Sequence, residues 1–324
     1  MSSSVLVTGS SGMLGSAICR NIKCSPTLGK HKLLTPSRSE LNLENQNEVL
    51  NYFEKNNIEI IFHAAAKVGG IKANIDFPAD FINKNLSINS NVFEAARQFN
   101  VSKLLFFGSS CIYPKDAPVP IQESSLMKGE LEQSNYAYSV SKIAGITQCN
   151  KYAEQYGCDF RVLMPTNLYG INDNYEKNNS HVIPALISKF YMAVKDSRKE
   201  IKIWGSGNAV REFLHIDDLV SASFKIISLD QSDYTTLLTD NNVTHLNVGS
   251  FEEISIHDLC VLLKKISGYD GEIVFDDSYP EGVMRKTLCS RIINSIGWKP
   301  KIELIDGLDD AYLWYCNNFP NLRH

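Results

Sequence analysis

The fold of this chain can be inferred from one segment, Ser4-Val5-Leu6-Val7-Thr8-Gly9-Ser10-Ser11-Gly12-Met13-Leu14-Gly15. An apolar run of strand length is followed by three glycines in the spacing G-x-x-G-x-x-G and then by a helical pattern. Glycines at such a strand–helix junction let the backbone approach a pyrophosphate, which the helix N-terminus can hold. Three glycines alone often serve only a turn, so the flanking strand and helix carry the inference. The segment predicts a dinucleotide site built from Gly9, Ser10, Ser11, Gly12, Met13, Leu14 and Gly15.

Strand-like and helix-like segments alternate through the first half of the chain. Strands are expected at 4–8, 32–35, 59–62, 104–107 and 160–163, and helices at 43–56, 78–98 and 135–156. Apolar strands that are joined by crossover helices form a parallel sheet covered on both faces. Later segments predict helices at 181–195, 255–266 and 308–316 and a loop at 236–244. Another helix is expected to begin at 215–218, because acidic residues are favoured in a first turn.

We therefore expect an α/β protein with a Rossmann-type, doubly wound parallel sheet and a smaller C-terminal α/β domain for a substrate. The dinucleotide domain is predicted to comprise residues 1–168 and a returning segment at about 208–250. The substrate domain is predicted to comprise residues 169–207 and 251–324.

Composition limits the possible partners. A net charge of -4 favours neither nucleic acid nor an anionic membrane surface, and no apolar stretch is long enough to span a bilayer. No basic region precedes an apolar run at the N-terminus, so no secretory signal is expected. The 8 cysteines are scattered and form no C-x-x-C pair. This indicates reduced thiols in a cytoplasmic compartment and no metal site.

The end of the second strand should distinguish the two nicotinamide dinucleotides. An acidic residue there would bind the ribose 2′-hydroxyl of NAD, whereas an arginine can pair with the 2′-phosphate of NADP. The chain has Leu34-Thr35-Pro36-Ser37-Arg38 and no acid before Glu40. Arg38 therefore favours NADP(H), with a solvated loop arginine as the simpler alternative.

Tyr138 and Lys142 lie at i and i+4 of a predicted helix and so share one face. A tyrosine beside a lysine can protonate a carbonyl oxygen while a hydride arrives. We expect Lys142, together with the positive nicotinamide of the oxidised complex, to lower the Tyr138 pKa from ~10. Ser109 and Cys111 follow the predicted strand at 104–107, and Ser109 can orient the same carbonyl. A plain reductase has no use for the thiol of Cys111, which therefore indicates a second chemistry.

Several sequence blocks resemble the extended short-chain dehydrogenase/reductase family, and within it the enzymes that epimerise and reduce a GDP-linked 4-keto sugar. The blocks are Ala64-Ala65-Ala66-Lys67-Val68-Gly69-Gly70-Ile71, Gly108-Ser109-Ser110-Cys111-Ile112-Tyr113-Pro114, Met164-Pro165-Thr166-Asn167-Leu168-Tyr169-Gly170, Asn179-Ser180-His181-Val182-Ile183-Pro184-Ala185-Leu186, and Trp204-Gly205-Ser206-Gly207 followed by Arg211-Glu212-Phe213-Leu214-His215. The resemblance implies NADPH-dependent conversion of GDP-4-keto-6-deoxy-D-mannose to GDP-L-fucose, by epimerisation at C3 and C5 and then reduction at C4.

The resemblance also implies a role for each site residue. Tyr138, Lys142 and Ser109 serve the reduction, while Cys111 is the base and His181 the acid of epimerisation. Further cofactor contacts are implied for Arg38, Leu41, Ala65, Lys142, Pro165, Asn167, Leu168 and His181, and GDP-sugar contacts for Lys189, Trp204, Arg211 and Glu281. Lys67 could meet either ligand or be a surface lysine. Family members often carry arginine where this chain has Ser11, which leaves more of the 2′-phosphate to Arg38.

Two other functions stay open. A nucleotide-sugar epimerase or dehydratase that keeps NAD bound would return the nicotinamide to its starting state in each turnover, whereas a reductase consumes NADPH. A sensor protein would hold NADP without turnover, although such proteins usually lose the tyrosine or the lysine. The resemblance further implies a homodimer built on helices within 81–99 and 143–156, but a core-facing helix has the same apolar pattern.

Overall fold

The computed structural model describes residues 3–176, 180–278, 283–320 and 322. Its main feature is a 6-stranded parallel sheet in the order β2-β1-β3-β4-β5-β9. The strands are β1 (Ser4–Thr8), β2 (Lys32–Leu34), β3 (Ile58–His63), β4 (Lys103–Phe107), β5 (Phe160–Pro165) and β9 (Leu246–Val248). The strand order reverses between β1 and β3, and ligands of doubly wound sheets bind at such a switch point, outside the carboxyl ends of the strands. The predicted doubly wound sheet is confirmed.

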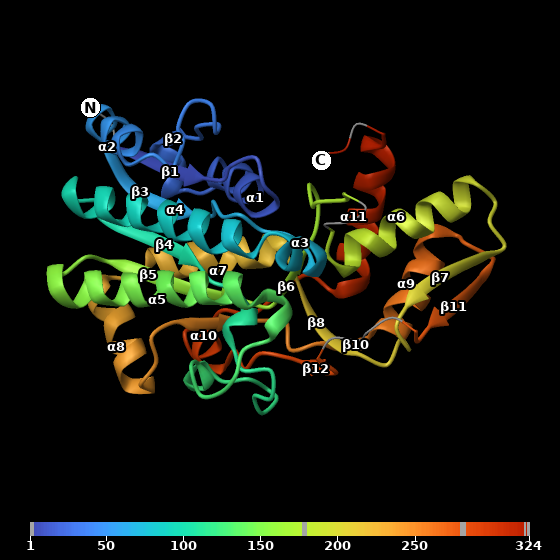
Figure 1. Cartoon of the computed structure of the whole chain (residues 1–324). Helices are drawn as coiled ribbons and strands as arrows, with labels where there is room; N and C mark the ends of the chain where they lie inside the picture. The colour runs from blue at the N-terminus through green and yellow to red at the C-terminus, as the bar shows by residue number, and fades with distance from the viewer. Residues whose placement is uncertain (1–2, 177–179, 279–282, 321, 323–324) are drawn as a thin grey trace.

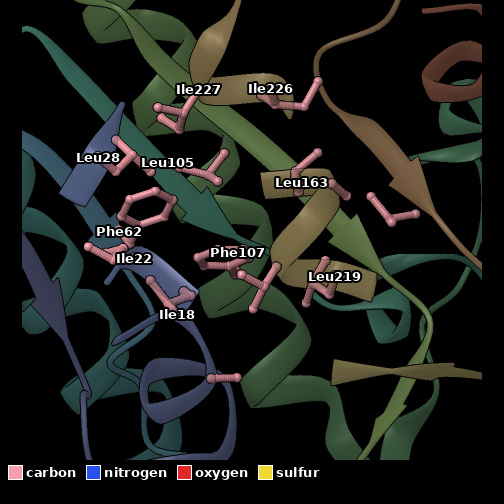
Figure 2. Close-up of a cluster of buried hydrophobic side chains, with 14 of the residues drawn as sticks. Ile18, Ile22, Leu28, Phe62, Leu105, Phe107, Leu163, Leu219, Ile226 and Ile227 are labelled. Atoms are coloured by element: carbon pink, nitrogen blue, oxygen red, sulfur yellow. The ribbon is translucent and has the colours of Figure 1, made fainter. Parts of the chain in front are cut away.

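Helices cover both faces of this sheet (Figure 1). One face packs against α1 (Met13–Ile22), α7 (Ile216–Ser228), α8 (Gln231–Asn241) and α10 (Arg291–Ser295), and the other against α2 (Gln46–Lys55), α4 (Pro78–Gln98) and α5 (Tyr136–Tyr156). Side chains alternate between the faces, so that Val5 and Val7 enter one core and Leu6 the other. Figure 2 shows the first core, in which Phe62 of β3 and Ile18 of α1 are both buried.

A smaller α/β unit follows the main sheet. In it β8 (Val210–His215) pairs with β6 (Asn167–Tyr169), β10 (Glu253–Ser255) and β12 (Arg285–Lys286), and β7 (Glu200–Trp204) pairs with β11 (Glu272–Asp276). The helices α6 (Val182–Lys195), α9 (Ile256–Ser267) and α11 (Leu304–Asn318) pack together around a separate apolar core. The remaining elements are α3 (Ile71–Asp76), η1 (Leu28–Lys30), η2 (Ser110–Ile112), η3 (Glu123–Ser125) and η4 (Gln133–Asn135). Figure 1 shows this unit beside the main sheet, as the predicted fold class requires.

The domain boundaries remain our proposal. The returning segment is represented by α7 and β9, which pack with the main sheet. Ile293 and Trp298 are also buried in the core of that sheet. We therefore propose that the segment around these two residues belongs to the first domain, and that β6 and β8, at the edges of the predicted ranges 1–168 and about 208–250, belong to the smaller unit instead.

The predicted loop at 236–244 is wrong, because most of it belongs to α8 (Gln231–Asn241). The segment is rich in Thr and Asn, whose low helix propensity favours a loop. Tertiary contacts outweigh that propensity. Tyr234 is buried, and its hydroxyl accepts a hydrogen bond from the backbone N–H of Val162 (3.0 Å), while Leu237 packs against the same core.

Other helices follow the sequence pattern closely. The helix expected to begin at 215–218 is α7, which starts at Ile216. Its N-cap is His215, whose Nδ1 accepts from the backbone N–H of Asp217 (3.3 Å). Within the described ranges we find no helix with the length and apolar character needed to cross a membrane.

Candidate active site

The glycine loop is packed too tightly for any side chain at two of its positions. Gly9 has a φ of +67°, and a Cβ there would lie 2.9 Å from the backbone of Ala65. A Cβ at Gly15 would lie 2.1 Å from the carbonyl oxygen of Gly9. Gly12 is the N-cap of α1 and offers no capping side chain, so the first N–H groups of this helix can bind an anion. This backbone cradle fits the pyrophosphate of a dinucleotide.

Arg38 lies in the segment after β2, beside the glycine loop. The Ser10 hydroxyl donates to the carbonyl of Thr35 (3.4 Å) and joins the two segments. The Arg38 guanidinium pairs with Glu44 (2.5 Å), but its side chain is 75% exposed and can turn toward a ligand. The side chain of Leu41 is buried in the core beneath this segment, so only its backbone can face a cofactor.

Four predicted catalytic side chains meet at the carboxyl end of β4. Ser109 follows this strand, and Cys111 lies in η2 immediately after it. The Cys111 thiol donates to the Ser109 Oγ (3.1 Å), and Ser109 also shares a hydrogen bond with the Tyr138 phenol. Lys142 lies one turn after Tyr138 in α5, and its ammonium donates to the Phe107 carbonyl at the end of β4 (2.7 Å). A thiol, a phenol, a hydroxyl and an ammonium therefore share one small region, in which Cys111 and Lys142 are buried and Ser109 and Tyr138 are half-buried.

In the protein without a bound nicotinamide the Tyr138 pKa is raised, so Lys142 alone does not produce the expected lowering. Burial raises the pKa of Tyr138 well above its ordinary value, and charge on Cys111 raises it further, while the hydrogen bond with Ser109 opposes them. Burial also lowers the pKa of Lys142 to about 8. The Lys142 ammonium is directed to the Phe107 carbonyl and lies 5.8 Å from the centre of the Tyr138 ring. The phenol is therefore held protonated, as a proton donor requires.

Other predicted cofactor contacts lie at the carboxyl ends of neighbouring strands. Ala65 follows β3 and lies against the glycine loop. Pro165 ends β5, and Asn167 and Leu168 belong to β6 directly after it. The Asn167 side-chain amide donates to the Glu212 carbonyl on β8 (2.9 Å), so its orientation is fixed.

His181 lies at the start of α6, on the smaller unit. The residue is exposed, yet the protein around its imidazole lowers its pKa, because desolvation disfavours the charged form. Among the described side chains no hydrogen bond or ion pair joins His181 to Cys111. An acid and a base that act on opposite faces of a sugar need not touch, since the sugar lies between them.

The residues predicted for the GDP end are only partly brought together. The Lys189 ammonium donates to the carbonyl of Lys202 (3.0 Å) and lies 5.5 Å from the centre of the Trp204 ring. Trp204 is 65% exposed, which leaves ring surface for stacking. Arg211 lies in the other small sheet, on β8. Glu281 lies outside the described residues.

Lys286 is a further candidate site residue, which its local sequence does not indicate. This residue pairs with Arg211 across β12 and β8, and its charge interacts with that of Cys111. Burial lowers the Lys286 pKa. Its strand is only two residues long and carries no pattern that links it to Cys111, so only the fold reveals this proximity.

Lys67 has partners within its own region. Its ammonium pairs with Asp80 (3.1 Å) and lies 5.3 Å from the centre of the Phe81 ring. The Phe81 ring in turn contacts Tyr138 edge-on, with 6.1 Å between the ring centres. Lys67 thus supports one wall of the site.

Comparison with known proteins places this geometry in a family. Residues 5–239 match the NAD dependent epimerase/dehydratase family. The chain belongs to that family. GDP-L-fucose synthase of Escherichia coli (strain K12) is 44% identical over 319 residues, which are 98% of this chain and 98% of that protein. The resemblance inferred from the sequence blocks is therefore confirmed.

Solved structures of similar proteins have the same overall architecture. A GDP-6-OMe-4-keto-L-xylo-heptose reductase from C. jejuni has a TM-score of 0.90 and 35% identity, with 98% of each chain covered. A GDP-mannoheptose C4 reductase from Campylobacter jejuni, solved with NADP bound, has a TM-score of 0.87 and 36% identity, with 97% of this chain and 98% of that chain covered. Both of these similar proteins are named as reductases.

Proposed function

We propose that this protein converts GDP-4-keto-6-deoxy-D-mannose to GDP-L-fucose with consumption of NADPH, by 3,5-epimerisation followed by 4-keto reduction. The observation that carries the proposal is the placement of Cys111 beside Ser109 and Tyr138, with the thiol 3.1 Å from the Ser109 hydroxyl. A reductase needs only the phenol, the hydroxyl and Lys142. The similarity to the E. coli protein named GDP-L-fucose synthase supports the same assignment.

We propose NADP(H) as the cofactor, held by the glycine loop and by Arg38. Gly9 and Gly15 leave room for a pyrophosphate where a Cβ would clash, and α1 presents its uncapped N–H groups there. Arg38 would exchange Glu44 for the 2′-phosphate. When bound, the cofactor supplies the hydride that reduces C4.

In the epimerisation step, the Cys111 thiolate removes the proton at C3 or C5 of the 4-keto sugar, and His181 returns a proton on the opposite face. The 4-keto group makes these carbons acidic, and Ser109 can donate a hydrogen bond to its oxygen as charge develops there. Positioned acid–base groups of this kind contribute ~10²–10⁴-fold each. Desolvation lowers the His181 pKa, which strengthens its imidazolium as an acid and reduces the fraction of His181 that is protonated at neutral pH.

In the reduction step, Tyr138 donates its phenolic proton to the C4 oxygen. Burial keeps this proton on the phenol until the alkoxide forms, because the charged phenolate is disfavoured in the buried site. The Lys142 ammonium, held by the Phe107 carbonyl, provides positive charge one helical turn away when Tyr138 loses its proton.

We also propose that the protein is cytosolic and forms a homodimer. All eight cysteines are free thiols, which supports a reducing, cytosolic compartment. The apolar residues of α4 and α5 that suggested a homodimer are largely buried within this chain, for example Phe93 and Ile146, so they do not by themselves require a partner.

The test is to incubate the enzyme with NADPH and the 4-keto sugar in heavy water and to identify the product. We expect one NADPH consumed for each GDP-L-fucose formed, with deuterium at C3 and C5. The Cys111→Ser variant should lose this deuterium while it still binds NADPH. Undiminished uptake in that variant would rule out Cys111 as the base.

A second candidate function is reduction at C4 without epimerisation, as the names of the two C. jejuni proteins indicate for those chains. The same experiment separates the two. NADPH consumption without deuterium at C3 or C5 in the unaltered enzyme would favour the simple reductase, and recovery of NADP in its starting state would favour an epimerase that retains its cofactor.

A further inference from the structure

A fully buried polar network lies directly behind the Cys111 turn. The Tyr113 hydroxyl contacts the Nε2 of His245 and the Oδ1 of Asn247, both at 2.6 Å. Tyr113 is 3% exposed, and His245 and Asn247 are 0% exposed. The backbone N–H of Asn247 donates to the buried carboxylate of Glu123 (3.0 Å). None of these four residues has a role in the chemistry proposed above.

The proton positions in this network follow from its partners. The Asn247 Nδ2 donates to the carbonyls of Ile121 (3.0 Å) and Cys289 (3.3 Å), which fixes Oδ1 as the acceptor facing Tyr113. Tyr113 must therefore donate to Asn247 and accept from His245. The His245 Nε2 then carries a proton, and its Nδ1 can accept from the Thr244 hydroxyl (3.1 Å). The network needs a neutral histidine and leaves none of these groups unsatisfied.

Tyr113 connects this network to Cys111. It ends the short turn η2, whose central residue is Cys111, and its N–H donates to the Ser110 carbonyl (3.4 Å). On the other side of the turn, the Ser139 hydroxyl of α5 donates to the Cys111 carbonyl (2.9 Å). The Cys111 backbone is thus held between α5 and the network beside β9.

Ser109 depends less on the network than Cys111 does. It follows Gly108, whose N–H donates to the carbonyl of Leu163 on β5 (2.9 Å), so the main sheet anchors the chain just before Ser109. Tyr138 and Lys142 are fixed in α5. Loosening the network should therefore displace the thiol more than the groups that serve reduction.

The same network also contacts the segment that follows Lys286, whose charge interacts with that of Cys111. Asn247 binds the Cys289 carbonyl, and Ile121 pairs with Thr287 and Cys289 through N–H···O bonds of 2.8 Å. Lys286, whose charge interacts with Cys111, comes immediately before this segment. The network therefore links the turn that carries Cys111 to the segment that follows Lys286.

We propose that Tyr113, held by His245 and Asn247, is a positioning residue that aims the Cys111 thiol at the sugar carbon during epimerisation. This inference rests on the proposed function. It predicts a selective defect: loss of the Tyr113 hydroxyl slows proton exchange at C3 and C5 and leaves hydride transfer at C4 almost unchanged.

Two rates measured on one preparation of Tyr113→Phe test this inference. The first is deuterium uptake by the 4-keto sugar in heavy water without NADPH, so that reduction cannot follow. The second is hydride transfer in the reverse direction, from GDP-L-fucose to NADP, followed by the absorbance of the reduced nicotinamide. We expect uptake to fall ~10–100-fold, as small misplacements of a reacting group do, and the reverse hydride transfer to change by less than about threefold.

Tyr175→Phe is the matched control, because the Tyr175 hydroxyl is buried in the smaller unit and has no hydrogen-bond partner among the described residues. It should leave both rates unchanged. A second pair of variants distinguishes a positioning defect from a folding defect. The amide nitrogen of His245→Gln can replace Nε2, whereas His245→Leu has no such donor. We expect more deuterium uptake by His245→Gln than by His245→Leu, with equal rates of hydride transfer in the two variants.

Three outcomes would overturn the inference. Uptake by Tyr113→Phe that matches the unaltered enzyme excludes a positioning role. An equal fall in uptake and hydride transfer shows a purely structural role for the network. If the unaltered enzyme takes up no deuterium, the proposed epimerisation itself is refuted, and with it any role for Tyr113 in that step. This outcome is distinguishable from the other two, because it appears in the unaltered enzyme and not only in the variant.

Discussion

Burial has opposite consequences for the two partners of the Tyr138–Lys142 pair. It raises the pKa of the phenol and lowers that of the ammonium to about 8, because in each case the charged form loses its water. The phenol therefore keeps its proton through the physiological range. Tyr138 is well placed as the acid of the reduction and poorly placed as a base in the protein without ligands.

Removal of that proton donor should abolish most of the reduction. We expect Tyr138→Phe to lower the rate of NADPH oxidation with the 4-keto sugar by ~10²–10⁴-fold, since the Tyr138 phenol is the group assigned to protonate the C4 oxygen, whereas the Cys111 thiol beside Ser109 is assigned to epimerisation. NADPH binding, measured by fluorescence titration, should be unchanged. Tyr136→Phe is the control, because Tyr136 begins the same helix and is 49% exposed. A Tyr138→Phe enzyme that reduces the sugar normally would disprove the assignment.

Among the structural elements, α7 depends on a buried cation. Arg161 of β5 is 0% exposed and forms two hydrogen bonds of 2.6 Å with Asp159. Its guanidinium also donates to the carbonyls of Ile226 and Leu229 at the C-terminal end of α7. The Lys103 ammonium donates to the Leu229 carbonyl as well (2.8 Å). These donors satisfy carbonyls that a helix end leaves without partners, and they join α7 to the sheet.

Loss of Arg161 should destabilise the protein strongly. Arg161→Met leaves the Asp159 carboxylate buried without its partner, and such changes cost ~3–5 kcal/mol in the free energy of unfolding. The control is Arg97→Met, which breaks an ion pair with Glu94 whose two side chains are 31% and 27% exposed. Because water reaches that pair, we expect a loss of only ~0–1 kcal/mol. Urea denaturation measures both, and equal losses would contradict the argument.

Across the whole molecule, two buried histidines connect segments that are far apart in the sequence. His63 joins the ends of β1 and β3 to α4, through Thr8 (2.8 Å) and Asn89 (3.2 Å). His245 supports the network behind the Cys111 turn. Burial, together with the charge of Lys142, lowers the pKa of His63 to about 3, and burial lowers that of His245 to about 4. Both are therefore neutral in the folded protein at neutral pH.

These histidines should make the protein sensitive to acid. The unfolded chain binds protons at an ordinary histidine pKa of about 6.5, whereas the folded protein binds them only near 3 to 4. Their contribution to stability is therefore complete above about pH 6.5 and is lost as the pH falls through the window down to these lower values. At about pH 5 we expect a loss of ~2 kcal/mol from each histidine.

Urea denaturation at about pH 7 and about pH 5 measures this loss. His63→Gln, which cannot be protonated, should have a smaller difference between the two conditions than the unaltered protein, by ~2 kcal/mol. The result that contradicts the prediction is an equal difference in both proteins. The matched control is His257→Gln, because the His257 side chain is 57% exposed. This variant should lose as much stability between the two conditions as the unaltered protein.

Local sequence patterns were sufficient to predict much of the fold of this protein. Continuous apolar strands, amphipathic helices and the glycine loop predicted the doubly wound sheet, because each of these signals comes from residues that are neighbours in the chain. The spacing of Tyr138 and Lys142 placed them on one helix face for the same reason. The failure at 236–244 shows the limit of this approach, since that helix is stabilised by the contact of Tyr234 with β5 rather than by its own propensity.

The environment of the site required the folded chain. Sequence spacing could not show that burial raises the Tyr138 pKa, that the charge of Lys286 interacts with that of Cys111, or that Tyr113 meets His245 and Asn247. Desolvation, charge proximity and buried hydrogen bonds depend on distances between segments that are remote in the sequence. Residue types and their spacing therefore indicate which chemistry is possible, and packing sets the protonation and orientation with which those residues can carry it out.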